Sequence, residues 1–200
     1  RGASVWSVDG QGGRLRGAPH LDVGASGTTA RFLTAVAALA DGPSRLDGSA
    51  RMRERPITEL VDALNGLGAE IGIEGANGCP PLAIPGGGLR GGEVEIDASR
   101  SSQFVSGVLP AAPYADRDVD LSFINGVLVS RPFVDLTLAV MRAFGARASW
   151  QGERLRVSAG CPYQPRVYPI EPDAQTAVYG FAAAAIAGGR VRVDGIPAES

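Results

Sequence analysis

The sequence contains no lysine: all 19 of its basic residues are arginine. Any reaction that needs a lysine ammonium group must therefore take it from outside these 200 residues. With 21 acidic residues the formal net charge is −2, which argues against a nucleic-acid-binding surface. Long apolar runs are also missing. The longest, 181–187, is far shorter than the roughly 20 residues that cross a bilayer, so no membrane contact is expected.

Cysteine and histidine are scarce. Cys79 and Cys161 each precede a proline, and no CxxC motif or Cys/His cluster accompanies the single His20. A disulfide framework or a zinc site needs several such residues at set spacings, so we expect no metal and no other cofactor. The first residues carry no secretory leader pattern and no initiator methionine. We expect a cytoplasmic protein whose native start lies before residue 1.

What the sequence does contain is an internal repeat, with an offset of 75 to 78 residues. One copy starts at Ser26 and the next at Ser101. Both run through small hydroxyl residues, an apolar stretch, a glycine turn, Arg-Pro and Gly-Ala, in that order. A third copy starts at Asp173 and stops at Ser200. Such self-similarity indicates stacked copies of one supersecondary unit.

Each copy predicts the order β-α-β-α-β-β. In the second copy the patterns favour a strand over 92–98, a helix from Ser101 or Ser102 to about Tyr114, a strand over 118–124, a helix from Pro132 to Gly145, and a hairpin beyond it. The first copy matches it with strands at 21–23, 44–46, 69–74 and 82–84 and with helices from Ser26 and Pro56. Residues 4–16 indicate the closing hairpin of an earlier copy. We therefore predict an α/β (α+β) fold, cut within a unit at both ends, and periodicity does not tell whether helices or sheets lie inside.

The first candidate site is the helix start at Ser26–Arg31. Free N–H groups and the positive end of the helix dipole favour an anion there, and Gly27 allows a ligand to approach the backbone. Thr28 and Thr29 add hydroxyl donors, and Arg31 adds charge one turn along the helix. The alternative interpretation is an ordinary capped helix after a tight turn.

The second candidate is the equivalent helix start, Ser99-Arg100-Ser101-Ser102-Gln103. Two hydroxyls and an amide suit a phosphate or a sugar, although they also suit a simple helix cap. In a repeat fold the two equivalent helix starts would lie side by side and direct two dipoles at one anion.

The third candidate is the run Arg51, Arg53 and Arg55 just before a predicted helix. Guanidinium groups bind carboxylates and phosphates through two parallel hydrogen bonds, so this run could clamp an anion. The alternative is a solvated, charged loop. The corresponding position of the next copy retains Ser130 and Arg131.

At these residues the sequence resembles the EPSP synthase family. The family's LDxGxSGTTxR motif appears as LDVGASGTTAR at 21–31, and its RMRERPI element appears unbroken at 51–57. Its SSQF(L/V)S and SRP(Y/F)xDxT elements appear as SSQFVS at 101–106 and SRPFVDLT at 130–137. The resemblance extends over essentially all 200 residues and implies an inside-out bundle of repeated β-α-β-α-β-β units. It also implies that 1–170 is the first domain without its first element, and that 171–200 is the crossover and the truncated start of a second domain.

The resemblance also implies a reaction and a set of binding residues. The family transfers the enolpyruvyl group of phosphoenolpyruvate to the 5-hydroxyl of shikimate-3-phosphate. The resemblance implies that shikimate-3-phosphate is bound by Ser101, Ser102, Gln103 and Ser130. It implies that phosphoenolpyruvate is bound by Gly27, Thr28, Arg55 and Gln103, with Arg31 and Asp173 in supporting roles. Glyphosate is implied as an inhibitor of sensitive members, and the complete protein is expected to be a monomer.

Several positions depart from the family pattern. Many members have tyrosine at Phe133, so a hydroxyl contact would be lost, and most have Asn or Asp at Ala25. The family's DASSAS element stands here as DAQTAV at 173–178. The PGSKSxSNR element and the second domain, with its acidic base, are missing. We therefore expect these residues to bind substrate without turnover and leave the catalytic acid and base unassigned.

Two alternatives remain open at this point. The chain could be a non-catalytic anion-binding half-protein or the subunit of a split enzyme. It could also belong to another enolpyruvyl transferase or a related phosphate cyclase on the same fold, which the four motifs disfavour.

Overall fold

The computed structural model describes residues 5–13 and 15–196. It divides into two compact units, one ending at Pro165 and the other beginning at Arg166. Each unit is described by itself.

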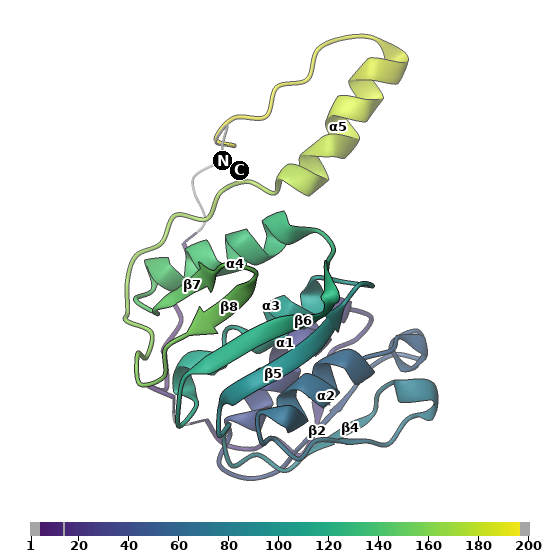
Figure 1. Cartoon of the computed structure of the whole chain (residues 1–200). Coiled ribbons are helices and arrows are strands. Elements are labelled where there is room, and N and C mark those ends of the chain that lie inside the picture. Colours follow the sequence, from purple (N-terminus) through teal and green to yellow (C-terminus); the bar gives the residue numbers. More distant parts are fainter. Residues whose placement is uncertain (1–4, 14, 197–200) are drawn as a thin grey trace. The chain divides into compact units, whose positions relative to one another are not determined.

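The first unit contains two four-stranded sheets of the same topology (Figure 1). One has the order β1-β2-β4-β3 and the other β5-β6-β8-β7. The strands are β1 (Leu21–Asp22), β2 (Ser44–Asp47), β3 (Gly72–Ile73), β4 (Leu82–Ile84), β5 (Gly92–Ala98), β6 (Val119–Leu128), β7 (Ala148–Gln151) and β8 (Arg154–Val157). In each sheet the first pair is parallel and the other pairs are antiparallel. The internal repeat predicted from the sequence is thereby confirmed as two copies of one unit.

The helices lie on the inner side of these sheets. They are α1 (Gly27–Ala38), α2 (Thr58–Gly66), α3 (Gln103–Val108) and α4 (Arg131–Ala143), with short 3₁₀ turns at Met52–Glu54, Ala76–Gly78 and Ala112–Tyr114. α1 contacts β2 and β4 of one sheet, α3 contacts β5 of the other, and α1 and α3 contact each other. This order settles what periodicity left open: the helices are inside and the sheets outside.

The core follows from the apolar spacing of the helices. Five of the six residues of α3 are buried, which makes it the central helix. On α2, Leu60 and Leu64 lie one turn apart and are completely buried, and burial of each such side chain contributes roughly 1.5–3 kcal/mol. On α4, Val134, Leu138 and Met141 face inward. This packing fixes the position of the first turn of each helix. The candidate site is formed by such first turns.

Several elements differ from their predictions. The strand expected over 69–74 is only β3 at Gly72–Ile73, and the helix expected from Pro56 begins at Thr58. The helix expected from Ser101 to Tyr114 ends at Val108, and a separate 3₁₀ turn follows at Ala112–Tyr114. Pro110 explains the break, since proline lacks the N–H of a helix interior and clashes with the preceding turn. The hairpin expected over 4–16 is also wrong where the chain is described: residues 5–13 form no strand, and Arg16 makes only an isolated bridge to Asp41. Residues 4 and 14 lie outside the described residues.

The second unit contains α5 (Ala174–Ala187), the helix start of the third copy. Asp173 caps it, because its Oδ1 accepts hydrogen bonds from the N–H groups of Gln175 at 2.9 Å and Thr176 at 3.2 Å. The helix is apolar on all sides, yet none of its residues is buried. Among the described residues, no helix is long and apolar enough to cross a bilayer.

Candidate anion-binding site

The first turn of α1 is built on a tight turn after β1. Asp22 Oδ1 accepts a hydrogen bond from the N–H of Gly24 at 2.9 Å, and Gly24 has a φ of 53°, which favours glycine. Ser26 is the N-cap, and its Oγ accepts from the N–H of Thr29 at 3.2 Å. The N–H groups of Gly27 and Thr28 belong to the first turn, whose donors have no acceptor within a helix. These two N–H groups are therefore available to donate hydrogen bonds to a ligand beyond the amino end of α1.

The first turn of α3 meets that of α1. The side-chain amide of Gln103 donates a hydrogen bond to Thr28 Oγ1 at 3.4 Å, between residues 75 positions apart. Ser101 Oγ accepts a hydrogen bond from the N–H of Gln103, the first residue of α3, at 3.2 Å. Ser102 is buried, and its hydroxyl makes no capping bond. The two helix starts that the repeat predicted to be neighbours are neighbours.

Two arginines enclose Gly27. A Cβ atom on this residue would lie 2.5 Å from Nη1 of Arg31 and 2.7 Å from Nη1 of Arg55. Arg55 donates to the carbonyl oxygen of Ala25 at 3.3 Å, and Arg31 donates to that of Gly27 at 3.0 Å. The missing side chain at Gly27 therefore allows two guanidinium groups to reach the positive end of α1. Together they make this end of the helix strongly attractive to an anion.

Arg31 is held on several sides. Its Nη2 donates to the carbonyl oxygen of Pro56 at 3.5 Å, and its guanidinium lies 5.0 Å from the centre of the Phe104 ring. Burial lowers the pKa of Arg31, the charge of Arg55 lowers it further, and the charge of Glu59 opposes both. An arginine side chain keeps its proton in proteins, so Arg31 remains a cation here.

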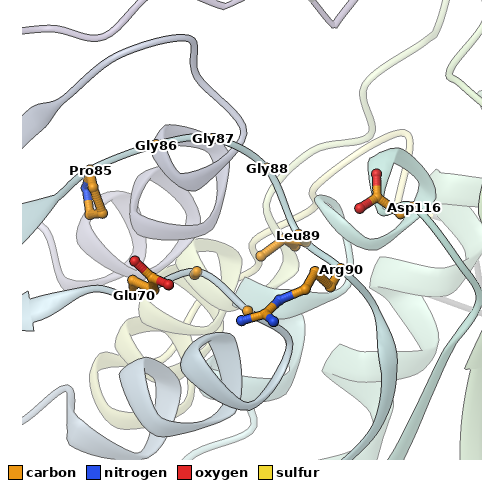
Figure 2. Close-up of a pocket in the computed structure, with 10 residues that line it drawn as sticks. Glu70, Pro85, Gly86, Gly87, Gly88, Leu89, Arg90 and Asp116 are labelled. Atoms are coloured by element: carbon orange, nitrogen blue, oxygen red, sulfur yellow. The ribbon is translucent and has the colours of Figure 1, made fainter.

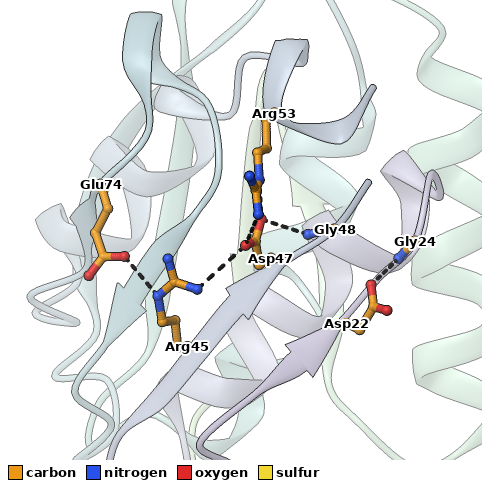
Figure 3. Close-up of polar contacts among 7 residues, drawn as sticks. All are labelled: Asp22, Gly24, Arg45, Asp47, Gly48, Arg53 and Glu74. Carbon is orange, nitrogen blue, oxygen red and sulfur yellow. Dashed lines mark hydrogen bonds and ion pairs between the residues drawn. The ribbon is translucent and has the colours of Figure 1, made fainter. Parts of the chain in front are cut away.

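The arginine run does not act as one clamp, which corrects the interpretation of the third motif. Arg53 makes two hydrogen bonds to Asp47, from Nε at 3.0 Å and from Nη2 at 2.6 Å (Figure 3). Arg51 pairs with Glu54 at 2.7 Å. Only Arg55 of the three approaches α1. The pairs form because carboxylates lie within reach of the first two arginines, on the end of β2 and on the same 3₁₀ turn.

Asp47 is the centre of that charged network. The carboxylate is buried, and besides Arg53 it accepts a hydrogen bond from the N–H of Gly48 at 2.8 Å. Arg45 lies between Asp47 at 3.4 Å and Glu74 at 2.9 Å (Figure 3). The hydrogen bonds from Arg53 lower the pKa of Asp47 to about 2, against the effect of its burial. The network braces the loop that carries Arg55 against the end of β2.

The first turn of α4 is held differently. Ser130 has a left-handed backbone with φ 53°, and its side chain makes no capping bond. The guanidinium of Arg131 lies over the Trp150 ring at 4.0 Å, and the indole N–H of Trp150 donates to Asp135 at 2.7 Å. Within the described part of the chain, a hydrogen bond links this helix to α3, because Thr137 Oγ1 donates to Ser106 Oγ at 2.9 Å. Ser130 is therefore at a helix start of the same layer but is not joined to the others by a hydrogen bond.

A hollow lies near the carboxyl ends of α1 and α2 (Figure 2). It has a volume of about 310 Å³ and is lined by Glu70, Arg90, Asp116 and the three glycines at 86–88. The N–H of Gly88 bonds to the carbonyl oxygen of Ala38, and that of Arg90 bonds to Leu67. The negative ends of two helices and two carboxylates oppose an anion there. The candidate site is thus at the amino ends of the helices.

The remaining predicted residue, Asp173, lies in the second unit and caps α5. No group of three or more metal-ligating side chains occurs in the described part of the chain. Sequence reasoning missed Glu59, which pairs with Arg100 at 3.1 Å beside the α3 start. No local pattern could have found it, because 41 residues separate the two.

Comparison with known proteins gives one consistent result. The family model described as EPSP synthase (3-phosphoshikimate 1-carboxyvinyltransferase) matches residues 1–200. A 3-phosphoshikimate 1-carboxyvinyltransferase of Methanoculleus marisnigri is 48% identical over 177 residues, covering 88% of this chain and 42% of that protein. The corresponding protein of Trichormus variabilis is 43% identical over 195 residues, covering 96% of this chain and 46% of that protein. The chain spans less than half the length of these curated relatives.

The solved structures agree. EPSP synthase from Acinetobacter baumannii superposes with a TM-score of 0.71 at 28% identity, over 84% of this chain and 37% of that one. The match of the family model to the whole chain and the identity of its relatives leave one assignment. The chain belongs to the EPSP synthase family.

Proposed function

We propose that this chain is part of an enzyme that transfers the enolpyruvyl group of phosphoenolpyruvate to the 5-hydroxyl of shikimate-3-phosphate, a step toward aromatic amino acids. The observation that carries the proposal is the joining of two helix starts by Gln103 and Thr28, with Arg31 and Arg55 against Gly27. Both substrates carry a phosphate and a carboxylate, and such an assembly of donors and cations is what anionic substrates require.

The roles of the residues follow from their positions. We assign phosphoenolpyruvate to the α1 side, with Gly27, Thr28 and Arg55, because two guanidinium groups approach that turn. We assign shikimate-3-phosphate to the α3 and α4 starts, with Ser101, Ser102 and Ser130, since these offer hydroxyls rather than charge. Gln103 lies between the two and serves both ligands, whereas Arg31 and Asp173 act in support.

The chemistry these residues supply is binding and charge stabilisation. Addition of the 5-hydroxyl to C2 of phosphoenolpyruvate, with protonation at C3, gives a tetrahedral intermediate from which phosphate leaves. The anionic charge that accumulates needs preorganised cations and N–H donors, which Arg55 and the helix starts provide. Proton transfer needs a separate acid and base, and we assign none within this chain. We therefore propose that these 200 residues bind substrate but do not turn over.

The other properties that we propose follow from membership of the family. The complete enzyme works as a cytoplasmic monomer without a cofactor, and glyphosate competes for the phosphoenolpyruvate pocket. Residues 1–170 belong to one domain of this enzyme, and 171–200 form the crossover to the other.

The test is a pair of measurements on the purified chain. Calorimetry should detect binding of shikimate-3-phosphate, and a phosphate-release assay with both substrates should stay at the level of the blank. Phosphate release by the chain alone would refute the claim that it lacks the acid and base. A folded chain that binds neither substrate would refute the assignment of the site.

A further inference from the structure

Glu59 stands beside the candidate site without belonging to any of its motifs. It is the second residue of α2, and its side chain is only 13% exposed. Its Oε1 accepts a hydrogen bond from Nη1 of Arg100 at 3.1 Å. Arg100 immediately precedes Ser101, Ser102 and Gln103. Glu59 therefore ties the loop that leads into α3 to the inner helix α2.

The second oxygen of Glu59 makes no hydrogen bond in the described part of the chain. Glu59 Oε2 and Arg31 Nε are buried atoms for which the described part of the chain offers no hydrogen-bond partner. The two groups are close enough for the charge of Glu59 to act on Arg31 and stabilise its cationic form. Arg31 also reaches Pro56, three residues before Glu59, so α1 and the start of α2 are in contact at this place. Among the described residues no ion pair joins Glu59 to Arg31, so the two buried groups are coupled through charge and not through a direct contact.

We propose that Glu59 is a positioning residue for both ligands: its carboxylate holds Arg100 of the α3 start through Oε1, and its charge orients the nearby Arg31 of the α1 start. This inference rests on the proposed function, since it concerns the same site. Glu59 touches neither ligand. It orients the guanidinium that lies against Gly27, and it fixes the loop from which Ser101, Ser102 and Gln103 are presented.

The direction in which one substitution changes ligand affinity separates this role from a simple charge effect. A carboxylate near an anion site repels the anion, so neutralising it should strengthen binding if charge alone matters. Under the proposal the same change weakens binding, because the freed guanidinium and loop lose their orientation. Glu59→Gln keeps the size of the side chain and removes only its charge.

The loop provides a matched control. Glu54→Gln makes the same chemical change in an exposed ion pair with Arg51, at 2.7 Å and with 62% of the Glu54 side chain exposed. An exposed pair of this kind contributes little. Arg100→Gln breaks only the α3 branch of the proposed bridge.

The experiment is calorimetric titration of the chain with shikimate-3-phosphate and, in its presence, with phosphoenolpyruvate. Glu59→Gln should weaken both affinities by about tenfold, as expected when hydrogen bonds to a charged group are lost. Arg100→Gln should weaken only shikimate-3-phosphate binding, and Glu54→Gln should change neither. Unchanged or tighter binding by Glu59→Gln would overturn the inference while leaving the proposed function intact. Absence of binding by the unaltered chain would refute the proposed function instead.

A second measurement tests the bridge without any ligand. The Nε–H resonances of Arg31 and Arg100 in nitrogen-15 NMR spectra should both shift in Glu59→Gln and stay in place in Glu54→Gln. If the Arg31 resonance does not respond to Glu59→Gln in a folded chain, Glu59 does not hold Arg31 and the inference is wrong.

Discussion

The side chain of Gln103 donates a hydrogen bond to the hydroxyl of Thr28, 75 residues earlier in the chain. The two residues occupy equivalent positions in successive copies of the repeat, at the starts of α1 and α3. One contact thus brings two helix dipoles and their free N–H groups to the same place. Duplication of a single β-α-β-α-β-β unit produces the site, because each copy contributes the same helix end.

Replacing Gly27 by alanine should leave the stability of the fold intact but weaken ligand binding at the site. A Cβ atom would displace the ends of Arg31 and Arg55, which lie 2.5 and 2.7 Å from it. We expect Gly27→Ala to weaken phosphoenolpyruvate binding by about tenfold, the loss that follows when a charge-assisted hydrogen bond is misplaced. The unfolding free energy should not fall, since alanine favours a helix over glycine by up to about 1 kcal/mol. Calorimetry and urea denaturation measure the two effects.

The comparison for this variant is Gly72→Ala on β3, where a Cβ atom would meet nothing nearer than 3.9 Å. It should leave binding unchanged. Equal loss of affinity in both variants would show that the arginines at Gly27 are not the cause.

Substitutions of Arg55 and Arg51 should have very different effects on ligand affinity, although the two arginines belong to the same run. Arg55 reaches the carbonyl oxygen of Ala25 next to α1, whereas Arg51 pairs with Glu54. Arg55→Gln should therefore weaken binding of phosphoenolpyruvate about tenfold or more. Arg51→Gln is the matched control and should leave the affinity within error. Similar losses in both would restore the interpretation of the run as one clamp.

The stability of the chain should depend on Asp47 in acid. Its pKa is about 2 in the folded protein, compared with about 3.9 in an unfolded chain. Because the folded pKa is the lower one, the stabilisation is complete above about pH 5 and is lost as the pH falls toward 2. It amounts to about 2.5 kcal/mol, since one pKa unit corresponds to about 1.4 kcal/mol.

Urea denaturation of the chain and of Asp47→Asn between pH 7 and pH 2 measures this contribution as a difference. The difference should shrink as the pH falls, and Arg53→Gln should remove most of it. A difference that stays constant with pH would mean that Asp47 acts through packing and not through its charge.

Local patterns predicted much of the fold. Strands at 82–84 and 92–98 have the predicted bounds, because their alternation and flanking glycines are local signals. The start of α1 follows from Ser26, an N-cap that acts as its position predicts. The break after Val108 was missed although Pro110 stood in the sequence, since the apolar spacing continues beyond it.

The only part of the site that could be predicted was the part that follows from the internal repeat. Equivalence of the two copies indicated that the two helix starts would be neighbours, and the hydrogen bond between Thr28 and Gln103 shows that they are. The partners of the arginines were not predictable, because Asp47 falls in the predicted glycine turn after the strand at 44–46 and Glu59 is an ordinary residue of a predicted helix. Which of Arg51, Arg53 and Arg55 stays available to a ligand is decided by carboxylates that only the folded chain brings near.

The central claim is that the first turns of α1 and α3 form one anion site. Its most direct test is calorimetric titration of the chain with shikimate-3-phosphate, beside Ser102→Ala/Gln103→Ala and the control Ser149→Ala/Gln151→Ala. The control removes the same groups from an exposed pair on β7. We predict binding by the chain and the control, and a loss of about tenfold or more in the site variant. Equal affinity of all three proteins would contradict the claim.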